Sequence, residues 1–95
     1  AIGVEVIGKA GYGEGASYWN EGKAAVDGDC AVNSSGGLIA KGHPIGATGV
    51  SMAYEIVRQL RGECGERQVP DADVGLTHNV GGIGQYCFVN VFRRD

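Results

Sequence analysis

Glycine is the feature that most limits what this chain can fold into, because 18 of its 95 residues are glycine. The usual share is only about 7%. These glycines follow no collagen period, and they are mixed with valine, isoleucine and alanine rather than with polar filler. Such a mixture favours tight turns and close backbone approaches over disorder. We expect a single domain over residues 1–95, and an incomplete one, since so short a chain buries only a modest core.

The charge and hydropathy of the chain argue against nucleic-acid binding and membrane insertion. Its formal net charge is −3 and its lysines and arginines do not cluster strongly, so the basic surface of a nucleic-acid-binding protein is missing. No apolar run approaches the roughly 18 residues that span a membrane, and the first residues do not resemble a secretory signal. The first residue is not methionine, which fits a fragment or a processed product.

The three cysteines, Cys30, Cys64 and Cys87, form an odd and widely spaced set. Their number and spacing fit neither a disulfide framework nor a zinc site. We therefore expect a reduced, cytoplasmic protein without a metal site. Cys87 falls inside a predicted strand, where we expect it to be a small buried hydrophobic residue.

The clearest predicted element is an amphipathic helix from about residue 48 to residue 61. Apolar side chains recur there at spacings of three and four residues, which is typical of one helix face. Arg58 and Arg61 lie in its last turn, where cations suit the helix dipole, and Gly62 is a typical stop. The apolar positions are Val50, Ala53, Tyr54, Val57 and Leu60.

Shorter segments are expected to form strands, so the predicted fold class is α/β. Residues 30–33 and 74–77 are short candidates. Residues 86–92 carry largely apolar side chains on both sides, which suits a strand covered on two faces. Residues 9–15 and 81–84 are glycine-rich and predict a loop and a turn. The GxGxG spacing at 11–15 could suggest a nucleotide loop, but the strand-then-helix context of a dinucleotide site is missing.

Chemistry-bearing residues concentrate in residues 33–49, immediately before the predicted helix. A glycine-rich loop can bring backbone N–H groups close to a ligand, and a helix N-terminus favours developing negative charge. His43 stands between Gly42 and Pro44, so its backbone is constrained while its ring can face a cavity. Such a histidine could move a proton near neutral pH or donate to an oxyanion. The residues alone leave open that it only bonds its own loop.

A second cluster, residues 77–84, places His78 at a predicted strand end followed by a glycine turn. Free backbone donors in such a turn can also face a ligand. The simpler alternative is a polar turn whose hydrogen bonds are satisfied locally.

The two clusters together resemble a known family. Residues 33–49, with Gly42-His43-Pro44 at their centre, look like the signature loop of thiolases. The stretch from residue 4 to residue 92 is similar to the end of thiolases of the archaeal and sterol-carrier-protein type. Residues 59–62, 67–69 and 78–82 match the same subgroup. One glycine-rich loop would be weak evidence, whereas two motifs in the right order with a matching helix between them are specific.

The resemblance implies an acyl-CoA C-acyltransferase that forms or cleaves a β-ketoacyl-CoA. His43 would activate a nucleophilic cysteine and line the oxyanion hole, with backbone groups of Gly42 and Gly81 as further candidates for contacts to oxyanion or coenzyme A. His78 stands about where many thiolases carry an acid/base cysteine, so it is a candidate catalytic residue. Acyl-CoA would be the substrate, and no covalently bound cofactor is expected.

The resemblance also implies what this chain lacks. Thiolases consist of two αβαβα-layered halves, and residues 1–95 would supply one central helix and mixed-sheet strands at the end of the second half. The nucleophilic cysteine belongs to the first half, and none of the three cysteines here has a matching context. We therefore expect residues 1–95 alone to be inactive and to need the rest of a thiolase chain.

Two other functions stay open. One is a thiolase-like aldolase acting on a CoA ester, in which the cysteine machinery is lost. The other is a non-catalytic assembly module, since thiolases generally form homo-oligomers and this subgroup resembles proteins that work with a zinc-ribbon/OB-fold partner. Tyr12, Tyr18 and Trp19 could form an exposed patch for such a partner, or could simply cover their own loop.

Overall fold

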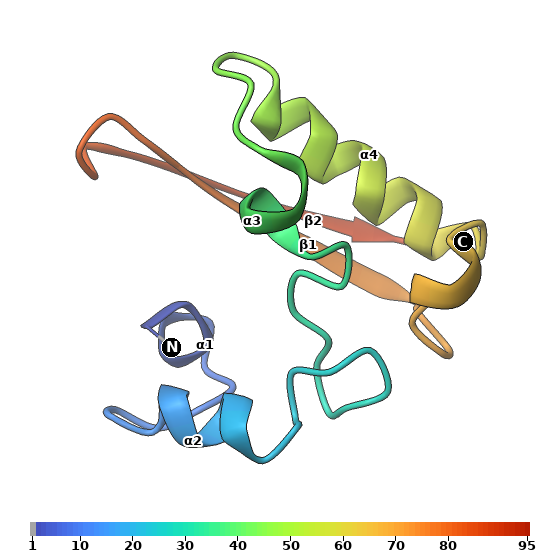
Figure 1. Ribbon diagram of the computed structural model, residues 1–95, viewed down its shortest axis with the longest axis horizontal. Helices are drawn as coiled ribbons and strands as arrows, with labels where there is room; N and C mark the ends of the chain where they lie inside the picture. Colours follow the sequence, from blue (N-terminus) through green and yellow to red (C-terminus); the bar gives the residue numbers. More distant parts are fainter. Residues whose placement is uncertain (1) are drawn as a thin grey trace. The chain divides into compact units, whose positions relative to one another are not determined.

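The computed structural model describes residues 2–95, and it divides into two compact units, one up to Ser34 and one from Ser35 to Asp95 (Figure 1). Each unit is described by itself. The first contains α1 (Ile2–Val6) and α2 (Gly15–Asn20). The second contains α3 (Gly37–Lys41), α4 (Thr48–Leu60), a 3₁₀ turn η1 (Gly65–Arg67), and the strands β1 (Val74–Gly81) and β2 (Tyr86–Arg93).

The first unit is held by a small core and by one carboxylate. Val4 of α1, Tyr18 of α2 and Ala24 are buried together. The Glu5 carboxylate accepts hydrogen bonds from the backbone N–H groups of Gly13, at 2.8 Å, and Gly15, at 3.0 Å. These bonds fasten the predicted glycine-rich loop to α1, so a short helix that is marginal alone gains tertiary support.

One expectation for this unit is wrong. Residues 30–33 form no strand, because the N–H groups of Cys30 and Val32 donate to the carbonyls of Lys23 and Ala24 and fold the segment onto the preceding turn. Of the two alternatives left open for the aromatic residues, the structure excludes Tyr18 from an exposed patch. It is 4% exposed, because its ring enters the core and its hydroxyl donates to Asp29 at 3.1 Å.

The second unit packs α4 against one face of an antiparallel pair formed by β1 and β2. The strands pair along their whole length, from Val74 opposite Arg93 to Gly81 opposite Tyr86. A Cβ at Gly75 would lie 2.5 Å from Cγ2 of Ile56, so only glycine allows α4 to approach the sheet this closely. The predicted helix, the strand near 86–92 and the turn near 81–84 are confirmed. The expectation that this strand is covered on two faces is wrong, because most residues of β2 are exposed. The strand predicted over 74–77 extends four residues further.

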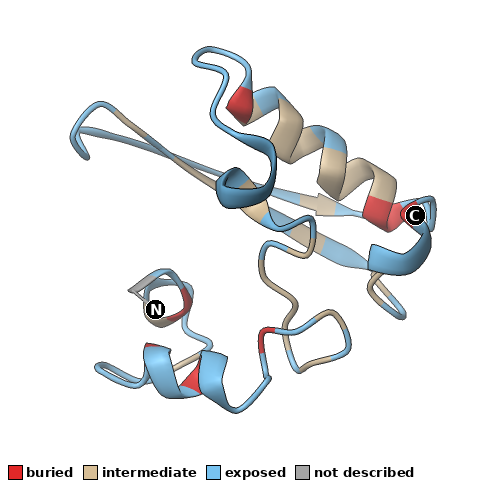
Figure 2. Cartoon of the chain, in the orientation of Figure 1, coloured by how far each residue is buried: buried red, intermediate tan, exposed pale blue. Residues whose placement is uncertain are grey.

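Strand alternation divides the residues of β1 between two faces. Gly75, Thr77, Asn79 and Gly81 share the face towards α4, and His78 belongs to the other face. Much of the sheet is exposed (Figure 2). Cys87 is therefore exposed rather than buried, because within residues 35–95 the only helix packed on the pair is α4 and it covers one face.

A polar network fixes the connector that follows α4. Gln59, 5% exposed, donates from Nε2 to the carbonyl of Arg67 at 2.8 Å and accepts from the N–H of Val69 at 2.9 Å. Arg67 meets the Glu55 carboxylate at two points, 2.9 and 3.1 Å. These bonds hold the chain at the correct place to enter β1.

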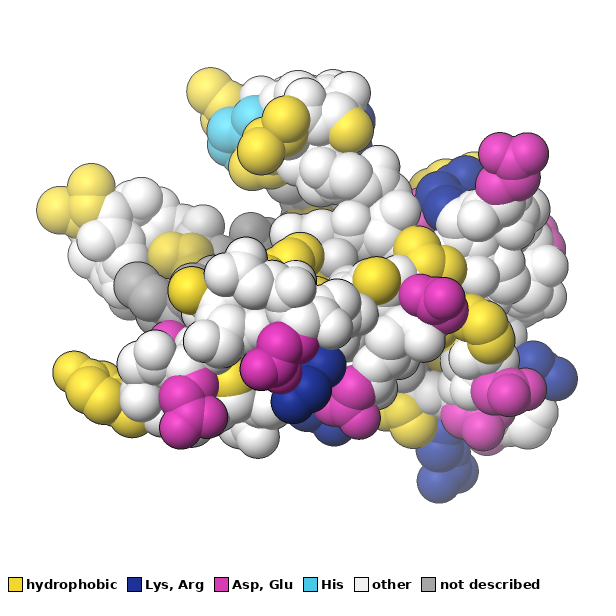
Figure 3. Space-filling view, turned by 60° about the horizontal axis from the view of Figure 1, so that its bottom comes forward, with side chains coloured by type: hydrophobic (Ala, Val, Ile, Leu, Met, Phe, Trp, Pro, Cys, Tyr) yellow, Lys and Arg dark blue, Asp and Glu magenta, His cyan; other side chains and the backbone are white. Residues whose placement is uncertain are grey.

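No helix among residues 2–95 is long and apolar enough to cross a membrane. Acidic and basic side chains are interspersed on the face drawn in Figure 3. This distribution agrees with the absence of a basic cluster in the sequence.

Candidate functional site

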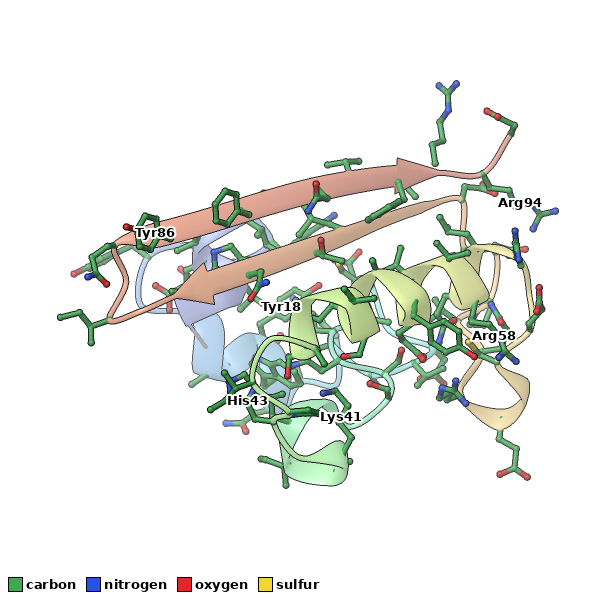
Figure 4. The ribbon with its side chains drawn as sticks, turned by 90° about the horizontal axis from the view of Figure 1, so that it is seen from above. Tyr18, Lys41, His43, Arg58, Tyr86 and Arg94 are labelled. Atoms are coloured by element: carbon green, nitrogen blue, oxygen red, sulfur yellow. The ribbon has the colours of Figure 1, made fainter. Side chains whose placement is uncertain are left out.

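His43 lies in the loop between α3 and α4 (Figure 4). Gly42 and Gly46 bracket this loop with φ angles of 82° and 85°, a region that glycine adopts without steric cost. The carbonyl of Pro44 accepts hydrogen bonds from the N–H groups of Ala47, at 2.9 Å, and Thr48, at 3.2 Å. The two glycines and these two bonds turn the chain into the first residue of α4.

The side chain of Thr48 orients the His43 ring. Its Oγ1 lies 2.7 Å from Nδ1 of His43 and donates to the carbonyl of Pro44 at 3.3 Å. A hydroxyl has a single proton, and a carbonyl can only accept. With that proton on Pro44, Oγ1 accepts from Nδ1–H, and this tautomer leaves Nε2 as the basic nitrogen. Thr48 is 8% exposed, so water competes little for the bond.

A pocket of about 660 Å³ lies between this loop, the first turns of α4 and the ends of β1 and β2. Apolar side chains, including Phe88, share its walls with polar ones. The polar lining residues are His43, Thr48, Thr77, Asn79 and Asn90. Its lining contains no aspartate, glutamate, lysine or arginine. Charge that develops on a ligand there would be met by neutral donors and by the N-terminus of α4.

The pocket brings together some of the residues predicted from sequence and leaves others apart. His43 and Gly81, from the two separate motifs, line the same pocket. Gly42 shapes the loop but does not line the pocket, and His78 does not line it either. Alternation along β1 accounts for His78, because its neighbours Thr77 and Asn79 point to the side that faces α4.

Thr48 and Asn79 are the functional candidates that sequence reasoning missed. Thr48 appeared only as a helix start, although a hydroxyl five residues after a histidine at a helix entry could have suggested a partner. Asn79 was hidden because the strand was expected to end at residue 77. Extending the period-two pattern by two residues would have placed Asn79 beside Thr77.

The described residues contain no group of three or more histidine, cysteine, aspartate or glutamate side chains that could hold a metal ion. The cysteines lie elsewhere. Cys64 is buried near the end of α4, and burial raises the pKa of its thiol. Neither it nor Cys30 or Cys87 lines the pocket.

In this α/β unit, His43 stands between two glycines at the entry to a helix, and a second glycine motif lines the same pocket. This combination lies within a stretch of the chain that matches a known family. The family described as Thiolase C-terminal domain-like matches residues 1–94. This chain belongs to that family, which confirms the resemblance found in the sequence.

Individual proteins that are similar to this chain agree with the family assignment. The chain is 50% identical over 93 residues to an acetyl-CoA acetyltransferase of Methanothermobacter thermautotrophicus, covering 98% of this chain and 24% of that protein. It is 46% identical over 89 residues to human sterol carrier protein 2, covering 94% of this chain and 16% of that protein. A benzoylsuccinyl-CoA thiolase subunit of Thauera aromatica is 39% identical over 79 residues, which cover 82% of this chain and 20% of that protein. The chain thus spans about a quarter or less of these relatives.

Proposed function

We propose that residues 1–95 belong to an acyl-CoA C-acyltransferase that forms or cleaves a β-ketoacyl-CoA by acyl transfer to or from coenzyme A. The observation that carries this proposal is the geometry of His43. Its Nδ1 is engaged by Thr48 at 2.7 Å, and its ring lines a pocket that the second glycine motif also lines. Membership of the thiolase family supplies the reaction class.

His43 acts on a cysteine supplied by another part of the enzyme. Nε2, the basic nitrogen in the favoured tautomer, takes the thiol proton, and the thiolate attacks the thioester carbonyl of the acyl-CoA. The carbonyl oxygen becomes negative as the new carbon–sulfur bond forms. The bond between the carbonyl carbon and the sulfur of coenzyme A then breaks, and the His43 imidazolium returns the proton to that sulfur. Coenzyme A leaves as its thiol, and the acyl group stays on the cysteine.

Charge on the thioester oxygen is stabilised from two sides of the pocket. The imidazolium of His43 and the first turn of α4 favour negative charge on one side. On the other side, the backbone near Gly81 lines the pocket. Gly42 contributes by setting the loop rather than by lining the pocket. The absence of carboxylates in the lining suits an oxygen that becomes negative during the reaction.

Acyl-CoA is the proposed substrate, and the proposed chemistry needs no bound cofactor. Two relatives are named for coenzyme A thioesters, acetyl-CoA and benzoylsuccinyl-CoA. The apolar wall that includes Phe88 would contact the acyl chain. Self-association and a zinc-ribbon/OB-fold partner rest on the resemblance alone, and size-exclusion chromatography with and without such a partner tests both.

An assay of acetoacetyl-CoA cleavage with free coenzyme A as the acyl acceptor tests the proposal, with the full-length enzyme and residues 1–95 compared side by side. The full-length enzyme should release acetyl-CoA, and residues 1–95 alone should not, because none of their cysteines lines the pocket. Cleavage at an enzyme-like rate by residues 1–95, or none by the full-length enzyme, would contradict the proposal.

A further inference from the structure

We propose that Asn79, rather than His78, is the residue of the second motif that contacts the substrate, its side-chain amide donating a hydrogen bond to an acyl oxygen of the CoA ester. This inference rests on the proposed function and names a further residue of the same site.

The register of β1 places Asn79 and His78 on opposite faces of the strand. Thr77, 5% exposed, is on the face that packs towards α4, and alternation puts Asn79 on that face as well. Asn79 lines the pocket together with His43. His78 lies between them in the strand, belongs to the opposite face and does not line the pocket. His78, which stands out in the sequence, is therefore on the face of β1 that points away from the pocket.

Asn79 closely approaches the first turn of α4. A Cβ at Gly49 would lie 2.7 Å from Nδ2 of Asn79, which is closer than real Cβ contacts. Glycine at this position therefore lets the amide lie against the helix backbone. The amide nitrogen therefore occupies the space beside Gly49 that a larger residue at this position would fill.

The Asn79 amide has no hydrogen-bond partner among the side chains and backbone of residues 2–95. The neighbouring polar side chains Asn90 and Thr77 do have a partner, because Asn90 donates a hydrogen bond to Thr77 at 3.4 Å. A half-buried amide with open bonding capacity in a pocket bonds either water or a ligand. Placed beside a pocket without charged side chains, its N–H groups suit a carbonyl oxygen that gains negative charge.

The test uses the full-length enzyme and acetoacetyl-CoA. Asn79→Ala should lower kcat about 10²-fold, as removal of an oxyanion donor does in other enzymes. Asn79→Asp keeps the size of the side chain and removes the N–H donors, so it should lose at least as much. His78→Ala, one residue away on the opposite face, is the matched control and should stay within about threefold of the wild type.

A second variant separates substrate contact from a structural role. Gly49→Ala displaces the amide, so it should lower kcat as Asn79→Ala does. Adding Gly49→Ala to Asn79→Ala should cost little more, because the group that it displaces is already gone. Circular dichroism melting of each variant identifies losses that come from unfolding. If Asn79→Ala does not fold, the isosteric Asn79→Asp decides the question.

The outcomes are distinguishable. An active wild type in which both Asn79 variants keep kcat within about threefold overturns this inference and leaves the proposed function standing. A larger loss in His78→Ala than in either Asn79 variant also overturns it. An inactive wild type overturns the proposed function, and this inference with it.

Discussion

The imidazole of His43 and the hydroxyl of Thr48 are joined by a 2.7 Å hydrogen bond between Nδ1 and Oγ1. Thr48 is the first residue of α4. The orientation of the proposed base is therefore set by the start of α4, the longest helix among residues 2–95, and α4 is itself fixed against β1. Through this bond, the packing of α4 on β1 also determines the orientation of the His43 ring.

Thr48→Val should weaken catalysis without removing the base. The variant keeps the side-chain shape but cannot hold Nδ1, so we expect kcat to fall roughly tenfold, less than the ~10²–10⁴ that a general base contributes. Thr48→Ser keeps the hydroxyl and should retain most activity. Steady-state kinetics with acetoacetyl-CoA compare the two. Equal activity of the wild type and Thr48→Val would show that the bond does not position His43.

Much of the second unit could be predicted from the sequence. The helix stood out because its apolar residues recur with helical spacing and a glycine follows its last turn. The strand at Tyr86–Arg93 and its preceding turn were visible from composition. The His43 loop could be located because it combines glycine, histidine and proline directly before that helix.

The remaining features depend on tertiary contacts that local pattern does not encode. Residues 30–33 have the composition of a strand, but hydrogen bonds to Lys23 and Ala24 hold part of them in a turn. The sequence does not show whether Tyr18 is exposed, because its burial depends on packing against Val4 and on the hydrogen bond that its hydroxyl donates to Asp29. Which of His78 and Asn79 lines the pocket depends on the register of β1, since a shift of one residue exchanges the two faces.

Gly75→Ala tests the close packing of α4 on β1. The new Cβ would lie 2.5 Å from Cγ2 of Ile56, so the helix or the strand must shift, at a cost of about 1–3 kcal/mol in the free energy of unfolding. In an Ile56→Ala background the same substitution should cost much less, because the opposing methyl group is gone. Urea unfolding of the four proteins measures this coupling. Additive effects would exclude the contact as the cause.

Glu55→Gln should lower stability at neutral pH and lose its effect in acid. The hydrogen bonds from Arg67 hold the pKa of the Glu55 carboxyl below its usual range. A lowered folded-state pKa gives stability that is present above the unfolded value of about 4.3 and is lost as the pH falls through the lowered one.

The expected size of the Glu55 effect is small. The Arg67 side chain is 43% exposed, so solvent screening limits the contribution to about 1 kcal/mol or less. Urea unfolding over an acid pH series, with the exposed Glu66→Gln as control, measures it. A difference between wild type and Glu55→Gln that persists unchanged into strong acid would contradict this account.

Tyr18 should titrate late in alkali. Burial, followed by the hydrogen bond to Asp29, raises its pKa to about 12. The folded state therefore keeps a proton that the unfolded chain loses near pH 10, and stability should fall as the pH rises from about 10 towards 12. Tyrosinate absorbance follows this step. Tyr18→Phe should remove it and Tyr12→Phe should not; the opposite result would contradict the assignment.

The most direct test of the central claim, that His43 activates a cysteine outside residues 1–95, is the rate of enzyme acylation in a single turnover. Full-length wild type and His43→Ala are mixed with acetyl-CoA, and the acetylated peptide is identified and timed by mass spectrometry. We predict acetylation of one cysteine outside this segment, slowed about 10²-fold or more in His43→Ala. Acetylation of Cys30, Cys64 or Cys87, or an equal rate in the variant, would contradict the claim.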